Sequence, residues 1–427
     1  MSEQGGVESE YGFEPDSGIP SSAGGLQSEP TNVTRGAALA TLLRPDAQRL
    51  LQGLTGPLEE LGFSGDAIAG LAGETRLVEA FGSAWYGPDF IDRSSPEERL
   101  RTWTALNQNA DPTAAIQFLF ALLGSNSERE SVAGAAALAR VVTYRDGPIA
   151  WLATDVTTPA WPDPPRVDLN TEWWTEAFED FVERTGRQTA DDQVVALRGL
   201  IGVRLRVAAY SNDPVVLSMV EAVRQAQADD FGGDGRALTS SLYPTPPGAL
   251  VVSTMVHGTF GWKGNWWRPK GAFHHYVGTH LRNNLYNRGA RFSWSGAYSQ
   301  SQRIQAAEDL VDWAGDVAPN GMQSVFAHSY GGEVAAIAAT TGARTHELIL
   351  LSAPGTQYVN DAATSVGRIV DIRMKGDLVL FIAGTPQRLA PAKNLTEVTL
   401  GWNLLGHSAT HDPATWVAEH IPGRAGL

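Results

Sequence analysis

Residues 249–427 alternate β-rich apolar runs with helix-forming stretches, and this alternation constrains the fold more than any other feature of the chain. The run 249–256 is unbroken and apolar, which is typical of a strand covered on both faces. Further β-rich runs lie at 291–294, 322–327, 347–351, 368–374 and 396–400. Such alternation predicts an α/β domain with a mostly parallel sheet and crossover helices.

The first half of the chain has a different composition. It is rich in Ala, Leu, Asp and Glu, and all nine His lie beyond residue 250. Two of its stretches, 123–140 and 210–224, resemble each other, because each is a polar turn that leads into an Ala/Val/Leu helix. This pattern is similar to HEAT and armadillo repeats, in which helix pairs stack to share a core. We therefore predict an all-α N-terminal domain, either a helical-repeat array or an irregular bundle.

Composition also sets the expected domain boundaries. Residues 1–33 begin with a long stretch rich in Ser, Gly, Glu and Pro, and are expected to form a disordered tail. The segment 231–248 contains clustered Gly, Ser and Pro, which favour exposed backbone, and is expected to be a linker. The predicted domains are therefore a helical domain at 34–230 and an α/β domain at 249–427.

Charge and composition exclude several functions. The N-terminus lacks the basic start and apolar segment of a secretory signal, and no apolar run approaches the roughly 20 residues of a membrane span. We expect a cytoplasmic protein without an integral membrane segment, unless a dedicated secretion machine exports it. The formal charge of −15 repels phosphate backbones, which argues against nucleic-acid binding. The absence of Cys excludes a Cys nucleophile, disulfides and thiolate metal sites.

The strongest local motif is the segment 325–332, Val-Phe-Ala-His-Ser-Tyr-Gly-Gly. A β-rich run enters it and an Ala-rich helix follows it, which is the pattern of a nucleophile elbow with Ser329 on the tight turn. Small residues at Ala327 and Gly331 suit this turn, because it brings neighbouring backbone against the serine. The alternative is a plain turn in which Ser329 only caps the helix.

A serine hydroxyl needs a base to take its proton, and the base needs a carboxylate that orients it and stabilises its charged form. Asp377 follows one predicted strand and His407 follows the last one. The chain order Ser, Asp, His is the order expected when the nucleophilic serine lies on a strand-to-helix turn. His411 is the alternative base, but it adjoins a helix cap. Asp371 is the alternative acid, but it lies within a predicted strand.

Acyl transfer also needs donors for the developing oxyanion, and two backbone N–H groups are expected to serve. One belongs to Tyr330, next to the nucleophile, and the other to Thr259, after the His257-Gly258 corner. His257 is expected to order this corner beside the substrate rather than to act as a base. Aromatic residues crowd the same corner and either wall a substrate pocket or pack in the core: Phe260, Trp262, Trp266 and Trp267.

Together these motifs make residues 249–427 resemble the α/β-hydrolase family, in its lipase and esterase branch. The resemblance rests on four segments: His257-Gly258, Ala327 to Gly332, Gly376-Asp377 and Gly406-His407. One departure is Ala327, which stands where the family more often has Gly. The resemblance implies that Ser329 is the nucleophile, His407 the base and Asp377 the acid, and that no metal or organic cofactor takes part.

The sequence therefore predicts a serine hydrolase that cleaves a carboxylic ester, of a small molecule or a lipid, through an acyl-enzyme. Two alternatives remain open at this stage. The chain could be a catalytically silent protein whose helical repeats bind a protein partner. It could also be an acyltransferase or peptidase, because these use the same triad and the fold does not distinguish them.

Overall fold

The computed structural model of the chain describes residues 31–44, 46–51, 54–72, 95–146, 190–231, 251–259, 265–287, 291–297, 299–401 and 406–427, with Trp174, Phe178 and Phe181 as isolated positions. Most of the predicted tail and linker lies outside these residues. The first helix begins at Asn32, so the last two residues of the predicted tail are helical.

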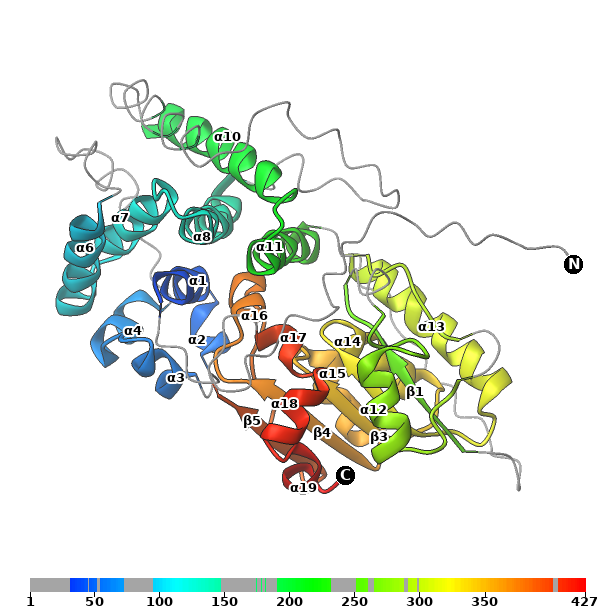
Figure 1. Cartoon of the computed structure of the whole chain (residues 1–427). Helices are drawn as coiled ribbons and strands as arrows, with labels where there is room; N and C mark the ends of the chain where they lie inside the picture. The colour runs from blue at the N-terminus through cyan, green and yellow to red at the C-terminus, as the bar shows by residue number, and fades with distance from the viewer. Residues whose placement is uncertain are drawn as a thin grey trace, which may run out of the picture.

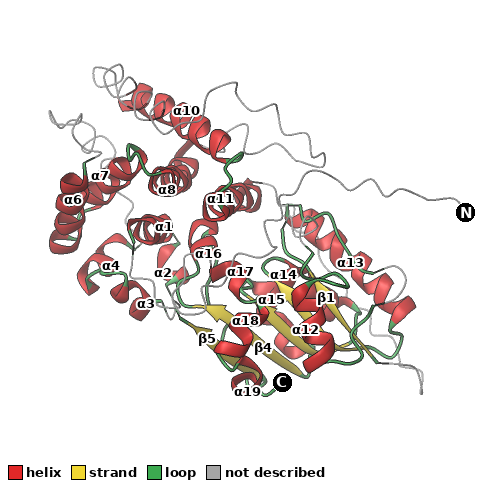
Figure 2. Cartoon of the chain, in the orientation of Figure 1, coloured by secondary structure: helices red, strands yellow, loops and turns green. Residues whose placement is uncertain are grey.

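The described part of the N-terminal region consists of helices and connecting turns, with no strand (Figure 2). Its helices are α1 (Asn32–Leu42), α2 (Ala47–Leu50), α3 (Thr55–Glu60), α4 (Gly65–Leu71), α6 (Pro96–Asn109), α7 (Pro112–Leu123), α8 (Glu128–Asp146), α10 (Ala190–Ala208) and α11 (Pro214–Phe231). Local sequence explains several of their starts. Ser95 caps α6 and is followed by Pro96, and Asp111 caps α7 and is followed by Pro112.

Helix α8 lies at the centre of this region and packs against α1, α7, α10 and α11. The approach of α7 to α8 is close, since a Cβ added to Gly134 would lie 2.6 Å from the backbone nitrogen of Leu123. The all-α prediction for the N-terminal half is therefore confirmed. The repeat interpretation stays a prediction. In a linear repeat array each unit packs only against its neighbours, whereas α8 packs against four helices, including α1 from the start of the chain.

The C-terminal region is built on a five-stranded sheet in which neighbouring strands are parallel and follow one another in chain order. The strands are β1 (Val252–Val256), β2 (Met322–His328), β3 (Thr345–Leu351), β4 (Arg368–Met374) and β5 (Leu395–Leu400). Because all five run the same way, their carboxyl ends lie along one edge of the sheet, where ligands bind in open α/β sheets.

The strand predicted at 291–294 is wrong, since this segment is not part of the sheet. The main-chain N–H of Trp294 points instead toward Nε2 of His257 at 3.5 Å, and the indole N–H donates to the carbonyl oxygen of His257 at 2.8 Å. These bonds tie the segment to the end of β1 rather than to a neighbouring strand.

Helices cover both faces of the sheet. On one face lie α13 (Gln300–Val317), α14 (Gly331–Thr341) and α15 (Gln357–Asp361), which share an apolar core with β2 and β3. On the other lie α12 (Ala272–His280), α18 (Pro413–Ala418) and α19 (Ile421–Ala425), which pack on the opposite side chains of the same strands. A 3-10 turn, Ala362–Thr364, follows α15.

Two short helices lie at the carboxyl edge, α16 (Leu378–Ala383) and α17 (Gly406–Ala409). Helix α16 leaves the sheet and packs against α1 and α11 of the N-terminal region (Figure 1). Four of its six residues belong to the hydrophobic core of the helical region: Leu378, Phe381, Ile382 and Ala383. The two regions are therefore joined through a common core.

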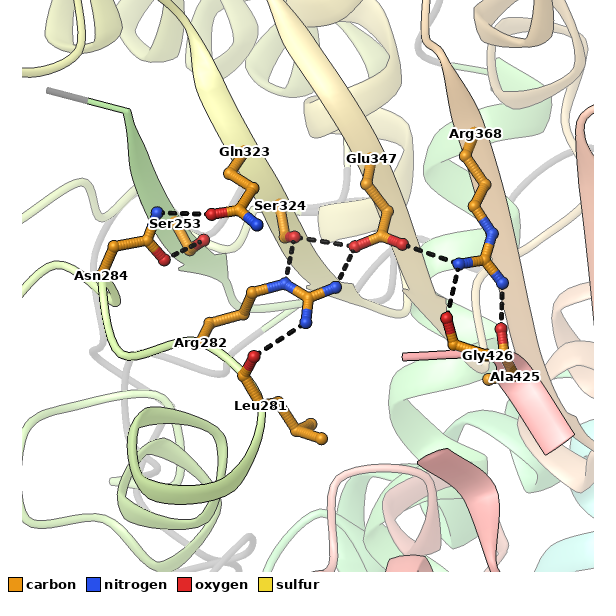
Figure 3. Close-up of polar contacts among 10 residues, drawn as sticks. All are labelled: Ser253, Leu281, Arg282, Asn284, Gln323, Ser324, Glu347, Arg368, Ala425 and Gly426. Carbon is orange, nitrogen blue, oxygen red and sulfur yellow. Dashed lines mark hydrogen bonds and ion pairs between the residues drawn. The ribbon is translucent and has the colours of Figure 1, made fainter. Parts of the chain in front are cut away.

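The amino edge of the sheet, where the strands begin, carries a network of hydrogen bonds and ion pairs centred on Glu347 (Figure 3). The carboxylate of Glu347 accepts hydrogen bonds from Arg282 at 2.5 Å, from Ser324 at 2.8 Å and from Arg368 at 3.1 Å. Arg368 also donates to the carbonyl oxygen of Gly426 at 2.9 Å. This network fastens the C-terminus to the sheet, at the edge opposite the carboxyl ends of the strands.

Candidate active site

Ser329 lies on a tight turn between β2 and α14, in the left-handed region of backbone space, with φ of 51°. This conformation is costly for a residue with a Cβ and persists only where the surroundings enforce it. Two hydrogen bonds enforce it here. The N–H of Ser329 donates to the carbonyl oxygen of Leu351 at 2.9 Å, and the N–H of Gly332 donates to the carbonyl oxygen of Ser329 at 2.9 Å.

Glycines let the end of β1 approach this turn closely. A Cβ added to Gly258 would lie 2.7 Å from the Cβ of Ser329, and one added to Gly331 would lie 2.4 Å from the carbonyl oxygen of His257. Neither position accommodates a side chain without a shift of the backbone. Ala327, where the family more often has Gly, is fully buried and packs in the core beside α14. The added methyl group is therefore accommodated.

Asp377 and His407 meet at the same edge of the sheet. Nδ1 of His407 lies 2.8 Å from Oδ2 of Asp377. Oδ1 of Asp377 caps α16, since it accepts hydrogen bonds from the N–H groups of Val379 at 2.9 Å and Leu380 at 3.3 Å. The side-chain amide of Gln387 bonds both the N–H of Asp377, at 3.0 Å, and its carbonyl oxygen, at 3.1 Å. Both the carboxylate and its backbone are thus fixed.

The environment favours the charged form of the Asp377 carboxyl. Burial acts to raise its pKa, but the charge and the hydrogen bond of His407 act against this. The N–H of Leu380 and the hydroxyl of Ser352 add to the effect of His407, and the pKa of Asp377 falls below its ordinary value. A carboxylate that stays charged while buried can hold an imidazole in one orientation and stabilise its protonated form.

His328 connects the elbow to the His407 helix. It directly precedes Ser329, and its Nε2 donates a hydrogen bond to the carbonyl oxygen of His407 at 3.0 Å. The two imidazole rings are 4.8 Å apart between centroids. The backbone of the expected base is therefore fastened to the residue next to the expected nucleophile.

The alternative base and the alternative acid lie in different surroundings. His411 stacks on Trp266, with ring centroids 4.4 Å apart, and meets the ring of His328 edge-on at 4.6 Å. Asp371 is fully buried in β4 and forms an ion pair with Arg373, whose Nε lies 2.7 Å from Oδ2. Burial raises the pKa of the Asp371 carboxyl to about 6, although the guanidinium of Arg373 opposes the shift. The carboxylate that faces His407 is that of Asp377.

Of the expected oxyanion donors, Tyr330 directly follows Ser329 in the chain, and Thr259 follows Gly258 just after β1. Tyr330 precedes the first residue of α14, where the main-chain N–H groups of a helix point outward and favour negative charge. Thr259 is half-buried and follows the glycine that touches Ser329. Phe260 and Trp262 lie outside the described residues.

The other residues predicted to bind substrate are buried. Trp266 and Trp267 are each 3% exposed. His257 is fully buried, its Nδ1 donates to the carbonyl oxygen of Gly258 at 2.9 Å, and its ring lies 4.7 Å from that of Trp267. The ring of Trp267 therefore packs against His257 and supports the His257-Gly258 corner.

Residues 286–379 match a family model described as Alpha/beta hydrolase. The C-terminal region is an α/β-hydrolase domain. The match includes the elbow at Ser329 and extends just past Asp377. The searches of curated proteins and of solved structures gave no match to this chain.

Sequence reasoning missed two residues that fix the candidate site, His328 and Gln387. His328 was within the elbow motif, but its bond to His407 spans 79 positions and leaves no local signal.

Among the described residues, no three His, Asp or Glu side chains are arranged to hold a metal ion. None of the described helices is both long and apolar enough to cross a membrane.

Proposed function

We propose that the α/β-hydrolase domain is a serine hydrolase that cleaves a carboxylic ester through an acyl-enzyme on Ser329. The observation that carries this proposal is the 2.8 Å pairing of His407 with Asp377, in a segment fastened to the elbow of Ser329 by His328. A strained serine turn, a paired imidazole and a buried carboxylate at one sheet edge are the parts that nucleophilic acyl transfer requires.

In this proposal Nε2 of His407 takes the proton of the Ser329 hydroxyl while Oγ attacks the ester carbonyl carbon. The resulting oxyanion accepts hydrogen bonds from the N–H groups of Tyr330 and Thr259. The alcohol leaves with the proton from His407, and an acyl-serine remains. Water then gives a proton to His407 and attacks the acyl carbon. As the bond to Oγ breaks, His407 returns that proton to Oγ, so that the acid is released and the Ser329 hydroxyl is restored.

His407 is the base we favour because its Nδ1 faces a carboxylate whose other oxygen accepts two main-chain N–H bonds, while Gln387 holds the backbone of the same residue. With Nδ1–H donated to Asp377, the lone pair lies on Nε2, where a base must have it. His411, by contrast, is packed against Trp266 and His328 and is only 4% exposed.

The proposal is tested with the full-length protein and a fluorophosphonate probe, which reacts with activated serines. We expect the wild-type chain to be labelled and Ser329→Ala to remain unlabelled. Ser365→Ala, at an exposed turn after α15, is the matched control and should be labelled like the wild type. Labelling of Ser329→Ala at the wild-type rate would contradict the proposal.

A series of p-nitrophenyl esters of increasing acyl length then defines the substrate. Free acid as the sole product supports hydrolysis, whereas an ester formed with an added alcohol identifies an acyltransferase. Cleavage of amide substrates with the same dependence on Ser329 identifies a peptidase.

A further inference from the structure

We propose that the N-terminal helical domain positions the catalytic acid Asp377 through helix α16, so that the triad is complete only when both domains are in place. This inference rests on the proposed serine hydrolase function. It assigns to the helical half a direct part in the geometry of the site.

The first support is apolar. Helix α16 begins directly after Asp377 and packs against α1 and α11 of the helical domain. Phe381 and Ile382 are essentially inaccessible to solvent, and both belong to the core formed by the N-terminal helices. An isolated helix of six residues is unstable in water, because helices shorter than about 12 residues rarely persist alone. The contacts with the helical domain therefore supply much of what holds α16 in place.

The second support is polar. The hydroxyl of Thr41 on α1 donates to the carbonyl oxygen of Phe381 at 3.0 Å, between groups that are both buried. The N–H of Phe381 in turn donates to the carbonyl oxygen of Asp377 at 3.0 Å. A chain of two hydrogen bonds thus runs from the helical domain to the backbone of the acid.

The helical domain also holds both ends of the segment that carries Asp377. Two residues before it, the ammonium group of Lys375 forms an ion pair with Glu60 at the end of α3. At the far end of α16, Gly384 adopts a φ of 66°, and a Cβ there would clash with the guanidinium of Arg44. The loop from β4 to the end of α16 is therefore held between contacts with the N-terminal half.

The position of α16 controls the carboxylate directly. Oδ1 of Asp377 accepts hydrogen bonds from the first turn of α16, which leaves Oδ2 for Nδ1 of His407. If this short helix rotated, the N–H groups of Val379 and Leu380 that hold Oδ1 would move, and the carboxylate would turn with them. The expected consequence is a loss of base orientation, which lowers the rate of acylation rather than the affinity for substrate.

The experiment uses four single variants of the full chain. Thr41→Val and Ile382→Val weaken the contact between α16 and the helical domain. Thr102→Val and Ile116→Val are the matched controls, because both residues are buried in the helical domain, on α6 and α7. The hydroxyl of Thr102 bonds its own helix, at the carbonyl oxygen of Glu98.

We expect Thr41→Val and Ile382→Val to lower kcat for an ester substrate about three- to tenfold with KM within about twofold, since each lost contact misplaces the carboxylate slightly. The controls should lose a comparable amount of thermal stability and keep kcat within about twofold, because α6 and α7 pack mainly against each other and against α1, α4 and α8. Thr41→Ser retains the hydroxyl and should restore the wild-type kcat.

The decisive measurement combines each variant with Asp377→Asn. If the contacts act through Asp377, then Thr41→Val and Ile382→Val reduce kcat no further in the Asp377→Asn background. Equal losses in both backgrounds, or losses in the controls as large as those at α16, overturn the inference while the serine hydrolase proposal stands. Absence of fluorophosphonate labelling in the wild-type chain overturns both.

Discussion

His328 donates a hydrogen bond from its ring Nε2 to the main-chain carbonyl of His407, over a distance of 3.0 Å. The donor precedes the expected nucleophile in the chain, and the acceptor belongs to the expected base. This bond holds the segment that carries His407 against the elbow. The bond from Nδ1 of His407 to Asp377 holds the same segment against the start of α16.

This bond predicts a catalytic loss when the ring is removed. His328→Ala should lower kcat about five- to tenfold, since one hydrogen bond that positions the base contributes about 1 kcal/mol. His328→Gln keeps an N–H donor at a similar reach and should recover part of the rate. His275→Gln, at an exposed position on α12, is the control and should behave as the wild type. Equal kcat values for His328→Ala and the wild type in a steady-state ester assay would show that the bond does not position the base.

A second prediction concerns the close contact between Gly258 and Ser329. Gly258→Ala places a methyl group where 2.7 Å separates its Cβ from that of Ser329, so the elbow or the corner must shift. We expect a loss of at least about tenfold in the rate of fluorophosphonate labelling, together with a lower melting temperature.

Gly199→Ala is the matched control for that substitution. It lies in the middle of α10, where an added Cβ meets nothing within 4 Å. It should raise stability by about 0.5–1 kcal/mol, because Ala favours the helix over Gly, and leave labelling unchanged. A wild-type labelling rate in Gly258→Ala would show that the approach of β1 to the elbow is not needed.

The sheet and the elbow could be predicted because their signals are local. The run 368–374 forms β4 with the predicted ends, and the turn at Ser329 follows directly from a strand–small–Ser–small–helix pattern. Side-chain type and spacing within about ten residues determine these features.

The rest depended on contacts between distant parts of the chain. Thr41 and Phe381 are separated by 340 positions, and nothing near Asp377 indicates that its helix belongs to the core of another domain. The aromatic residues after Gly258 gave an ambiguous signal, because tryptophans that wall a pocket and tryptophans that pack in a core have the same pattern. The structure places Trp266 and Trp267 in the core.

The buried Asp371 predicts a pH dependence of stability. Burial raises its pKa to about 6, whereas an aspartate in the unfolded chain titrates near 4. Between these values the unfolded chain has released the proton and the native protein retains it, so this group makes the native state less stable as pH rises from about 4 to about 6. Asp371→Asn should remove this contribution and flatten the pH profile of the urea midpoint. An unchanged profile would mean that Asp371 is ionised throughout this range.

The charge network at the amino edge predicts that a substitution there lowers stability without lowering the catalytic rate. Glu347 neutralises Arg282 and Arg368, so Glu347→Gln leaves two guanidinium groups without their counter-charge at the base of the sheet (Figure 3). The network is only partly buried, since the Arg368 side chain is 30% exposed, so we expect the free energy of unfolding to fall by about 1–3 kcal/mol. The network lies at the edge opposite Ser329, so kcat well below the melting temperature should stay within about twofold of the wild type. Chemical unfolding and an ester assay on the same sample measure both quantities. A large fall in kcat with the fold intact would show that the two edges of the sheet are coupled.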